Sequence, residues 1–284
     1  MRHGSRTVGG VEIVALCDGV VNAGGPATES FPGATDDAWA DVRTNHPDVF
    51  DGDVWRLHVH CFLLRAEDRT ILVDTGVGPE SAPAFSWTGR RGALLDELAA
   101  AGVDPLDVDT VVITHVHDDH LGWNVAEGAA RPLFAEARYL VHRDDWEYMS
   151  TSDDEEDRTI FPAVLAPLEA AGALELTGDR TRLTPAIEVV HAPGHTPGHQ
   201  VVLVDDGDDR AVVSGDLVNN PIQLRQPGVN GTTDMDPGLA AATRARYLER
   251  LIAEGRLAAA AHLPEAFGRF EAEGDHHRWS PAER

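Results

Sequence analysis

The strongest constraint on this chain lies at residues 114–120, whose sequence is Thr-His-Val-His-Asp-Asp-His. The three histidines and two aspartates follow an apolar run at residues 111–113, which is typical of a short buried strand. Few folding requirements gather so many imidazoles at the end of a strand. Binding of one or two metal ions does require it, and a metal pair that activates water would make the protein a candidate hydrolase.

Hydrophobic periodicity predicts strands that alternate with helices. Residues 55–64 alternate apolar and polar positions, and a turn at residues 67–69 leads into a second strand at 71–74. Helices are predicted at residues 91–101, where leucines recur at helical spacing, and at 237–254, which Asp236 caps. Further strands are predicted at residues 11–16, 139–141, 187–190, 201–204, 211–213 and 257–261.

The remaining long segment, residues 22–53, is rich in Gly, Pro and Asp and has few periodic apolar positions. It is predicted to form a long loop over a site. The chain shows no internal repeat and no linker of the kind that separates domains. We therefore predict one domain over residues 1–284, with a layered α/β fold that contains two β-sheets.

Charge and composition exclude several kinds of partner. The net charge is −25, and all 23 basic residues are arginine, so neither nucleic acid nor an anionic membrane is an expected partner. No run of about 18 apolar residues is present, and residues 1–10, with Arg2, His3 and Arg6, precede no apolar block. Neither a membrane span nor a signal peptide is expected. Cys17 and Cys61 do not suggest a disulfide framework, and the sequence favours a cytoplasmic protein.

The histidine cluster itself suggests two metal positions. His115 and His117 are two residues apart, so at the end of a strand both side chains would face the same metal. Asp119 and His120 follow in a turn and would point toward a second ion. Imidazole and carboxylate suit Zn²⁺, Mn²⁺ or Fe, and the lack of thiolates argues against a purely structural zinc site. The alternative is a set of surface histidines without metal.

Three other predicted strands end in a side chain that can bind metal. His195 lies in the sequence Ala-Pro-Gly-His-Thr-Pro-Gly-His at residues 192–199. Asp216 follows the strand at residues 211–213, and His262 follows the strand predicted at 257–261. These three side chains are therefore the candidates for the remaining ligands.

With these motifs in their order along residues 54–262, the chain resembles members of the metallo-β-lactamase superfamily. The resemblance rests on Asp-Thr-Gly at residues 74–76, the histidine cluster, Gly-His-Thr-Pro-Gly-His at 194–199, Gly-Asp at 215–216, and His262. It implies a four-layer αβ/βα sandwich with two mixed β-sheets. The site would lie along one edge of the two sheets.

The resemblance also implies two metal ions that share seven ligands. One ion would be held by His115, His117 and His195, and the other by Asp119, His120 and His262. Asp216 would bridge the two ions. The ions are expected to be divalent transition metals, Zn²⁺ first, with Mn²⁺, Co²⁺ or Fe as alternatives. Such a pair of ions would share a hydroxide, because it would lower the pKa of the bound water to near neutrality. Asp119 is expected to carry a proton to the leaving group.

Two nearby residues have weaker interpretations. Asp74 resembles the family's aspartate that orients a ligand-bearing loop, and the alternative is a carboxylate that only stabilises its own turn. His199 is expected to form structural hydrogen bonds near the metals rather than to bind one.

The shape of the chain most resembles that of N-acyl-homoserine lactonases and related organophosphate-hydrolysing enzymes, which implies hydrolysis of a small ester, with a lactone as the first choice. A thioesterase of the glyoxalase II type and a phosphotriesterase or aryl esterase are alternatives on the same fold. A regulatory or scaffold protein with a vestigial metal site is the alternative from another class. The expected partner is a small molecule, and a homodimer is a base-rate expectation.

Overall fold

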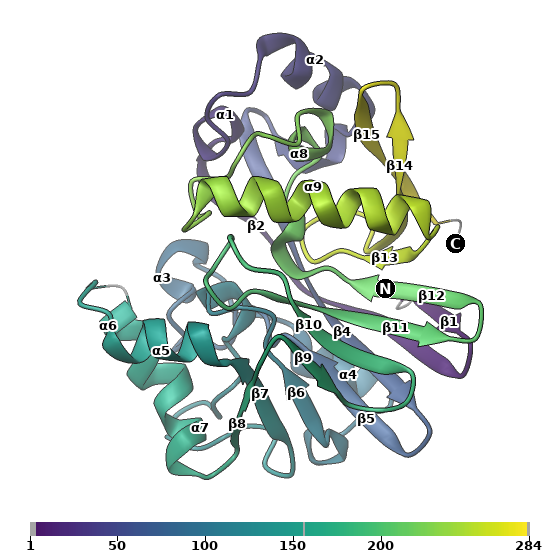
Figure 1. Cartoon of the computed structure of the whole chain (residues 1–284). Coiled ribbons are helices and arrows are strands. Elements are labelled where there is room, and N and C mark those ends of the chain that lie inside the picture. Colours follow the sequence, from purple (N-terminus) through teal and green to yellow (C-terminus); the bar gives the residue numbers. More distant parts are fainter. Residues whose placement is uncertain (1–3, 156, 283–284) are drawn as a thin grey trace.

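Two β-sheets stacked face to face form the middle of the molecule, and helices cover their outer faces (Figure 1). The computed structural model describes residues 4–155 and 157–282. Arg2 and His3, part of the N-terminal segment considered above, lie outside the described residues. No helix within the described ranges is both long and apolar enough to cross a membrane.

The first sheet has the strand order β1-β2-β4-β5-β6-β7-β8, with the short β3 paired to β4. Its strands are β1 (Ser5–Val8), β2 (Val11–Pro26), β3 (Phe50–Asp51), β4 (Val54–Ala66), β5 (Arg69–Val73), β6 (Thr110–Val112), β7 (Arg138–His142) and β8 (Leu174–Thr177). The second sheet has the order β15-β14-β13-β12-β11-β10-β9. Its strands are β9 (Arg180–Arg182), β10 (Ile187–His191), β11 (Gln200–Asp206), β12 (Asp209–Val213), β13 (Leu257–Ala259), β14 (Phe267–Glu273) and β15 (His276–Pro281).

The helices of the described residues are mostly short. They are α1 (Ala27–Ser30), α2 (Asp36–Asn45), α3 (Phe85–Thr88), α4 (Leu94–Ala100), α5 (Arg143–Thr151), α6 (Asp157–Ile160), α7 (Ala166–Ala170), α8 (Ile222–Arg225) and α9 (Pro237–Ala253). Single turns of 3₁₀ helix lie at Pro47–Val49, Pro105–Asp107, Asp118–His120 and Gly215–Leu217, and a π-helical turn lies at Phe161–Leu165.

Three apolar layers hold the sheets and helices together. Alternating side chains of both sheets, such as Ile71 and Val202, form the layer between the sheets. On the outer face of the first sheet, Leu94 and Leu98 of α4 pack against the strands, together with residues of α5 and α7. On the outer face of the second sheet, α9 contributes Leu248 and its neighbours (Figure 1). The predicted four-layer αβ/βα sandwich is therefore confirmed.

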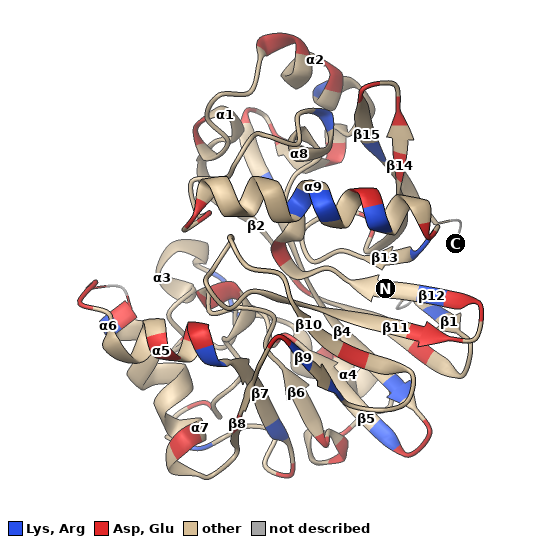
Figure 2. Ribbon diagram, viewed as in Figure 1, with Lys and Arg blue, Asp and Glu red and all other residues tan. Residues whose placement is uncertain are grey.

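The direction of the strands decides where a site can form. β5, β6 and β7 are parallel in the first sheet, and β12 and β13 are parallel in the second. The carboxyl ends of parallel strands meet at one edge of a sheet, where the following loops converge. The loops after β6, β12 and β13 contain the histidine cluster, Asp216 and His262. Figure 2 shows acidic residues on many of the loops and helix ends and fewer basic ones, in keeping with the net charge of −25.

The prediction of a long loop at residues 22–53 is wrong. β2 continues to Pro26, and α1, α2 and β3 follow it. Thr35 caps α2 by accepting the backbone N–H of Ala38 at 3.3 Å, and Phe31 and Trp39 are buried in an apolar cluster with Trp55. The helical signal is short, and its apolar partners lie outside the segment, on β4 directly after it and at Ile222 and Val229 far along the chain, so periodicity over the segment as a whole is weak.

The helix predicted at residues 91–101 begins later, at Leu94. The carboxylate of Asp18, which belongs to β2, accepts the backbone N–H of Leu94 and that of Val77, each at 2.7 Å. A residue far away in sequence therefore accepts a hydrogen bond from the first turn of α4, and no local capping residue marks the start of the helix.

Candidate metal centre

Thr114, in the loop after β6, forms hydrogen bonds that connect three segments of the chain. The backbone N–H of Thr114 donates to Asp74 Oδ1 at 2.7 Å, and its hydroxyl donates to Asp74 Oδ2 at 2.8 Å. The carbonyl of Thr114 accepts the N–H of Gln200, at the start of β11, at 2.8 Å. The histidine cluster therefore starts from a point fixed to both sheets.

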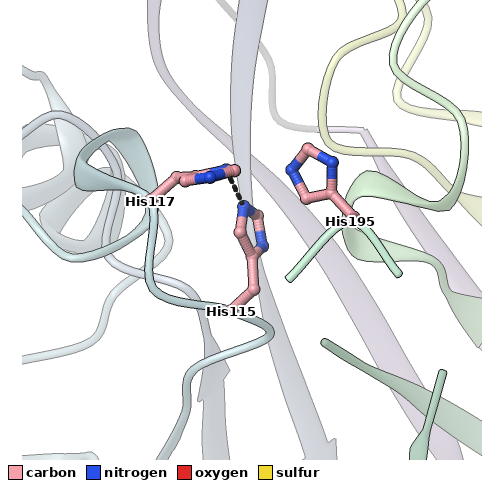
Figure 3. Close-up of side chains that lie close together, drawn as sticks. All are labelled: His115, His117 and His195. Carbon is pink, nitrogen blue, oxygen red and sulfur yellow. Dashed lines mark hydrogen bonds between the residues drawn. The ribbon is translucent and has the colours of Figure 1, made fainter. Parts of the chain in front are cut away.

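The first group of side chains is His115, His117 and His195, shown in Figure 3. His115 Nε2 lies 3.1 Å from His117 Nδ1, and the ring centroids of His117 and His195 are 4.6 Å apart. The reasoning from strand alternation does not apply, because β6 ends at Val112 and both residues of the cluster lie in the loop beyond it. Loop conformation, with His117 directly before a 3₁₀ turn, brings their nitrogens together.

The second group is Asp119, His120 and His262. The Nε2 atoms of His120 and His262 are 3.2 Å apart, and Asp119 Oδ2 lies 3.7 Å from each of them. Asp216 lies between the two groups. Its Oδ1 is 3.2 Å from His120 Nε2, and its Oδ2 is 3.2 Å from His195 Nε2, so one carboxylate reaches both groups.

These side chains fit a pair of transition metal ions. Within each group, nitrogen and oxygen atoms that can bind metal converge below the surface. Nε2 of His195 and Oδ1 of Asp216 are buried and have no hydrogen-bond partner among the described residues. Unpartnered buried polar atoms are strongly unfavourable unless something else satisfies them. Imidazole and carboxylate are the ligands that Zn²⁺, Mn²⁺, Co²⁺ and Fe accept.

Three of the proposed ligand histidines have Nδ1 held by a carboxylate or a backbone carbonyl oxygen. His120 Nδ1 lies 2.8 Å from Asp74 Oδ2, and His262 Nδ1 lies 2.7 Å from the carbonyl oxygen of His58. His195 Nδ1 lies 2.8 Å from Asp234 Oδ1. Since each acceptor requires an N–H on Nδ1, Nε2 is the nitrogen of each ring that is left to bind a metal ion at the centre of the site.

Asp74 therefore contacts a residue of the cluster rather than only its own turn. Its backbone φ of +61° lies in the left-handed region, which non-glycine residues seldom occupy. Its carboxylate, with bonds to Thr114 and His120, holds it there. Backbone strain of this kind persists where surrounding contacts determine the conformation, and it occurs often at functional sites.

His199 has no nitrogen available for a metal. Its Nδ1 lies 2.9 Å from the carbonyl oxygen of Ala192, and its Nε2 accepts the backbone N–H of Asp216 at 3.0 Å. Burial lowers the pKa of His199 to about 3, so the ring is neutral. The ring orients the backbone of Asp216, which is a structural role.

The pKa values of the histidines in the metal centre reflect how closely carboxylates and imidazoles are packed there. Burial lowers the pKa of His115 and of His117 well below the usual range. Burial also disfavours protonated His195, but Asp216 and Asp234 outweigh it and raise the pKa of His195 to about 9. The field that holds a proton on His195 would equally favour a metal cation in its place.

Sequence reasoning missed two buried aspartates behind the loop that contains His195. One is Asp234. The other is Asp145 of α5, whose carboxylate accepts the hydroxyl of Thr196 at 2.8 Å and the backbone N–H of Gly198 at 2.6 Å. Neither residue belongs to a recognisable motif, and both are far in sequence from the loop they hold. No local signal could have identified them.

A third group, His142, Asp144 and His191, also places possible metal ligands close together. Its geometry does not suit a metal. The two rings are stacked, with centroids 3.9 Å apart and planes 12° from parallel, so their lone pairs run side by side instead of converging. His142 Nδ1 already accepts the backbone N–H of Asp144 at 3.2 Å.

A cavity of about 600 Å³ opens onto the centre, with His117, Asp119, Asp216 and His262 among its lining residues. The volume is within the range of small-molecule sites. The predicted long loop contributes Ala23, Ser30 and Phe31 to its wall.

A four-layer sandwich with paired His/Asp groups at one edge of its sheets is the architecture of a metal-dependent hydrolase fold. Residues 54–262 match the sequence pattern of the Metallo-beta-lactamase superfamily, and the chain belongs to that superfamily.

Relatives of known identity share this region. The chain is 31% identical over 168 residues to an N-acyl homoserine lactonase of Bacillus sp, a match that covers 54% of this chain and 61% of that protein. It is 30% identical over 190 residues to the Homo sapiens acyl-coenzyme A thioesterase MBLAC2, covering 61% of this chain and 66% of that protein. The matched region thus spans less than two-thirds of either relative.

The solved structure of AidC, described as a dizinc quorum-quenching lactonase in complex with a product, has a similar fold over nearly the whole chain. The TM-score is 0.85 at 23% identity, and the match covers 99% of this chain and 98% of that chain.

Proposed function

We propose that this protein hydrolyses a small uncharged ester, with a lactone as the first choice, and that two divalent transition metal ions assist it. Zn²⁺ is the first candidate for both ions. The ligands are those expected from the sequence. One ion would be bound by His115, His117 and His195, and the other by Asp119, His120 and His262. Asp216 would bind both ions.

The observation that carries this proposal is the character of the cavity above the two groups. Its walls include apolar side chains that suit an aliphatic or aromatic arm of a substrate: Phe31, Trp55, Leu57, Val116, Met149, Ile160. Its floor is formed by residues of both groups. An ester whose apolar arm lies against these walls would place its reacting carbonyl at the floor.

The charges in the cavity narrow the substrate class. Asp118, Asp154 and Asp157 also line it, and within the described part of the chain no arginine does. The sequence contains no lysine. Carboxylates on the cavity wall disfavour anionic substrates such as coenzyme A thioesters, whose phosphates need positive partners. This favours a neutral lactone over an acyl-coenzyme A thioester.

When bound, the metal ions would acidify a water molecule and polarise the substrate carbonyl. Side chains and backbone groups of the protein would orient the ligands of the metal ions, and a side chain would transfer the proton. Asp74, Asp234 and the carbonyl of His58 fix three imidazoles, as described above. Asp119 has an 11% exposed side chain, against 4% for Asp216, so its carboxylate is the more accessible from the cavity. It is therefore placed to deliver a proton to the leaving alkoxide.

The lactonase relative supports this substrate class, while the thioesterase relative supports the thioesterase alternative. Phosphotriesters and aryl esters are also uncharged, so they stay as alternatives. A regulatory or scaffold protein would keep the fold without turnover.

The test is a hydrolysis screen of the zinc-loaded and manganese-loaded protein with acyl-homoserine lactones, neutral thioesters, coenzyme A thioesters, phosphotriesters and aryl esters. We expect metal-dependent turnover of lactones and none of coenzyme A thioesters, and two metals per chain by elemental analysis. His117→Ala should lose metal and activity, whereas His276→Ala, outside the cavity, should lose neither. Protein with no bound transition metal after purification without chelator would rule the proposal out.

A further inference from the structure

Asp234 is the residue that orients His195, and both of its carboxylate oxygens accept hydrogen bonds. Its Oδ1 contacts His195 Nδ1 at 2.8 Å. Its Oδ2 accepts the backbone N–H of Gly231 at 2.9 Å and the guanidinium Nη2 of Arg244 at 3.2 Å. Asp234 is 7% exposed, so the carboxylate is held from three sides inside the protein.

Arg244 lies on α9 and is buried, with 1% of its surface exposed. Its Nε donates to the carbonyl of Leu217 at 3.0 Å, and its Nη1 donates to those of Pro227 and Val229, each at 2.9 Å. Arg244 does not line the cavity above the metal centre. A buried guanidinium is tolerated only when its charge and its donors are satisfied, and Asp234 supplies the opposite charge. The arginine therefore acts on the site only through Asp234 and the backbone it binds.

Residues 231–235, which we call the strap, connect this pair to the cavity. Gly231, Thr232, Thr233 and Met235 line the cavity, with Asp234 between them. The backbone N–H of Met235 donates to the carbonyl of His195 at 3.0 Å. One short segment thus forms a wall of the cavity and holds both the backbone and the ring of His195.

We propose that Asp234 is a positioning residue for His195, that Arg244 fixes Asp234, and that this pair sets the affinity of the metal position to which His195 belongs. This inference rests on the metal role of His195 in the proposed function. The carboxylate keeps the proton of the ring on Nδ1 and leaves Nε2 free to bind. Loss of such a partner of a ligating histidine typically lowers metal affinity by about 10–100-fold.

The variants Asp234→Asn and Arg244→Met test the pair, and Asp18→Asn is the matched control. Asp18 is also a buried aspartate whose carboxylate accepts backbone N–H groups, but those belong to Leu94 and Val77, which are not proposed ligands. Competition of zinc between the protein and a chromogenic chelator gives the two affinities of each variant. We expect Asp234→Asn to weaken one of the two by about 10–100-fold and Arg244→Met to weaken the same one. Asp18→Asn should leave both unchanged.

A measurement on the unmodified protein keeps the inference testable if a variant fails to fold. Long-range ¹H–¹⁵N spectra of the zinc-loaded chain should show His195 protonated at Nδ1, with slow exchange of that proton. Protonation at Nε2 would overturn the inference, as would unchanged affinities in Asp234→Asn or an equal loss in Asp18→Asn. Failure of the unmodified chain to bind two metals would instead refute the proposed function, before any variant is compared.

Discussion

Replacing Asp74 with asparagine changes one carboxylate oxygen into an amide NH₂ and leaves the size of the side chain the same. The backbone conformation at φ +61° stays accessible, because asparagine tolerates the left-handed region. The amide oxygen can still accept the N–H of Thr114. The NH₂ group, however, then faces the Nδ1–H of His120, which was the donor to Oδ2 at 2.8 Å.

The expected cost follows from that one mismatch. A buried donor left without an acceptor costs about 1–3 kcal/mol, and His120 is 1% exposed. The hydroxyl of Thr114 can rotate to accept from the new amide, so its contribution is retained. Asp74→Ala leaves three donors without a partner and should lose about 3–9 kcal/mol by the same reckoning.

Urea unfolding in the presence of chelator measures this cost without any contribution from metal binding. A separate zinc titration should show a loss of affinity of about 10–100-fold at the position that includes His120. If Asp74→Asn unfolds at the same urea concentration as the original chain and binds zinc equally well, then Asp74 does not orient His120 and the reasoning is wrong.

Other substitutions test other parts of the molecule. Asp119→Asn should lower kcat by about 10²–10⁴-fold in a metal-loaded lactonase assay, and an equal loss for a substrate whose leaving group needs no proton would contradict its role in proton transfer. Phe62→Ala, between the sheets and 1% exposed, should lower the free energy of unfolding by about 3–5 kcal/mol, whereas Leu106→Ala, 59% exposed, should change it little. Burial lowers the pKa of His60 from 6.5 to about 3, so the unfolded chain binds the proton first, and stability is lost as the pH falls from 6.5 toward 3. In the presence of a chelator, the free energy of unfolding of His60→Gln should therefore fall less between pH 7 and pH 4.5 than that of the original chain. Equal decreases in the two proteins would show that this histidine does not contribute. Asp154→Asn combined with Asp157→Asn should raise kcat/KM for an anionic ester relative to a neutral one, and an unchanged ratio would remove the charge argument.

The proposed ligands could be identified from the sequence because each lies at the end of a strand or within a short motif. The histidine cluster lies within residues 114–120, Asp216 comes three residues after the end of β12, and His262 directly follows the apolar run that forms β13 and the two residues after it. Parallel strands bring such ends to one edge without further information. The fold class could be predicted for the same reason.

The residues that sequence reasoning missed act through contacts between distant segments. Asp18 caps α4 from β2, Asp145 holds residues 196 and 198 from α5, and Arg244 reaches Asp234 and three carbonyls from α9. A single buried aspartate or arginine has no periodicity and no spacing that distinguishes it from a surface residue. The helices within residues 22–53 were missed because their apolar partners lie on β4.

The placement of the two groups at the shared edge has a consequence for the stability of the sandwich. His115, His117, Asp119 and His120 come from the first sheet, whereas His195, Asp216 and His262 come from the second, and each group draws on both. Metal ions held there would act as a cross-link that fastens one sheet to the other at the rim of their apolar interface. The free energy of metal binding would then add to that of folding, so the melting temperature of the chain would report the supply of metal around it.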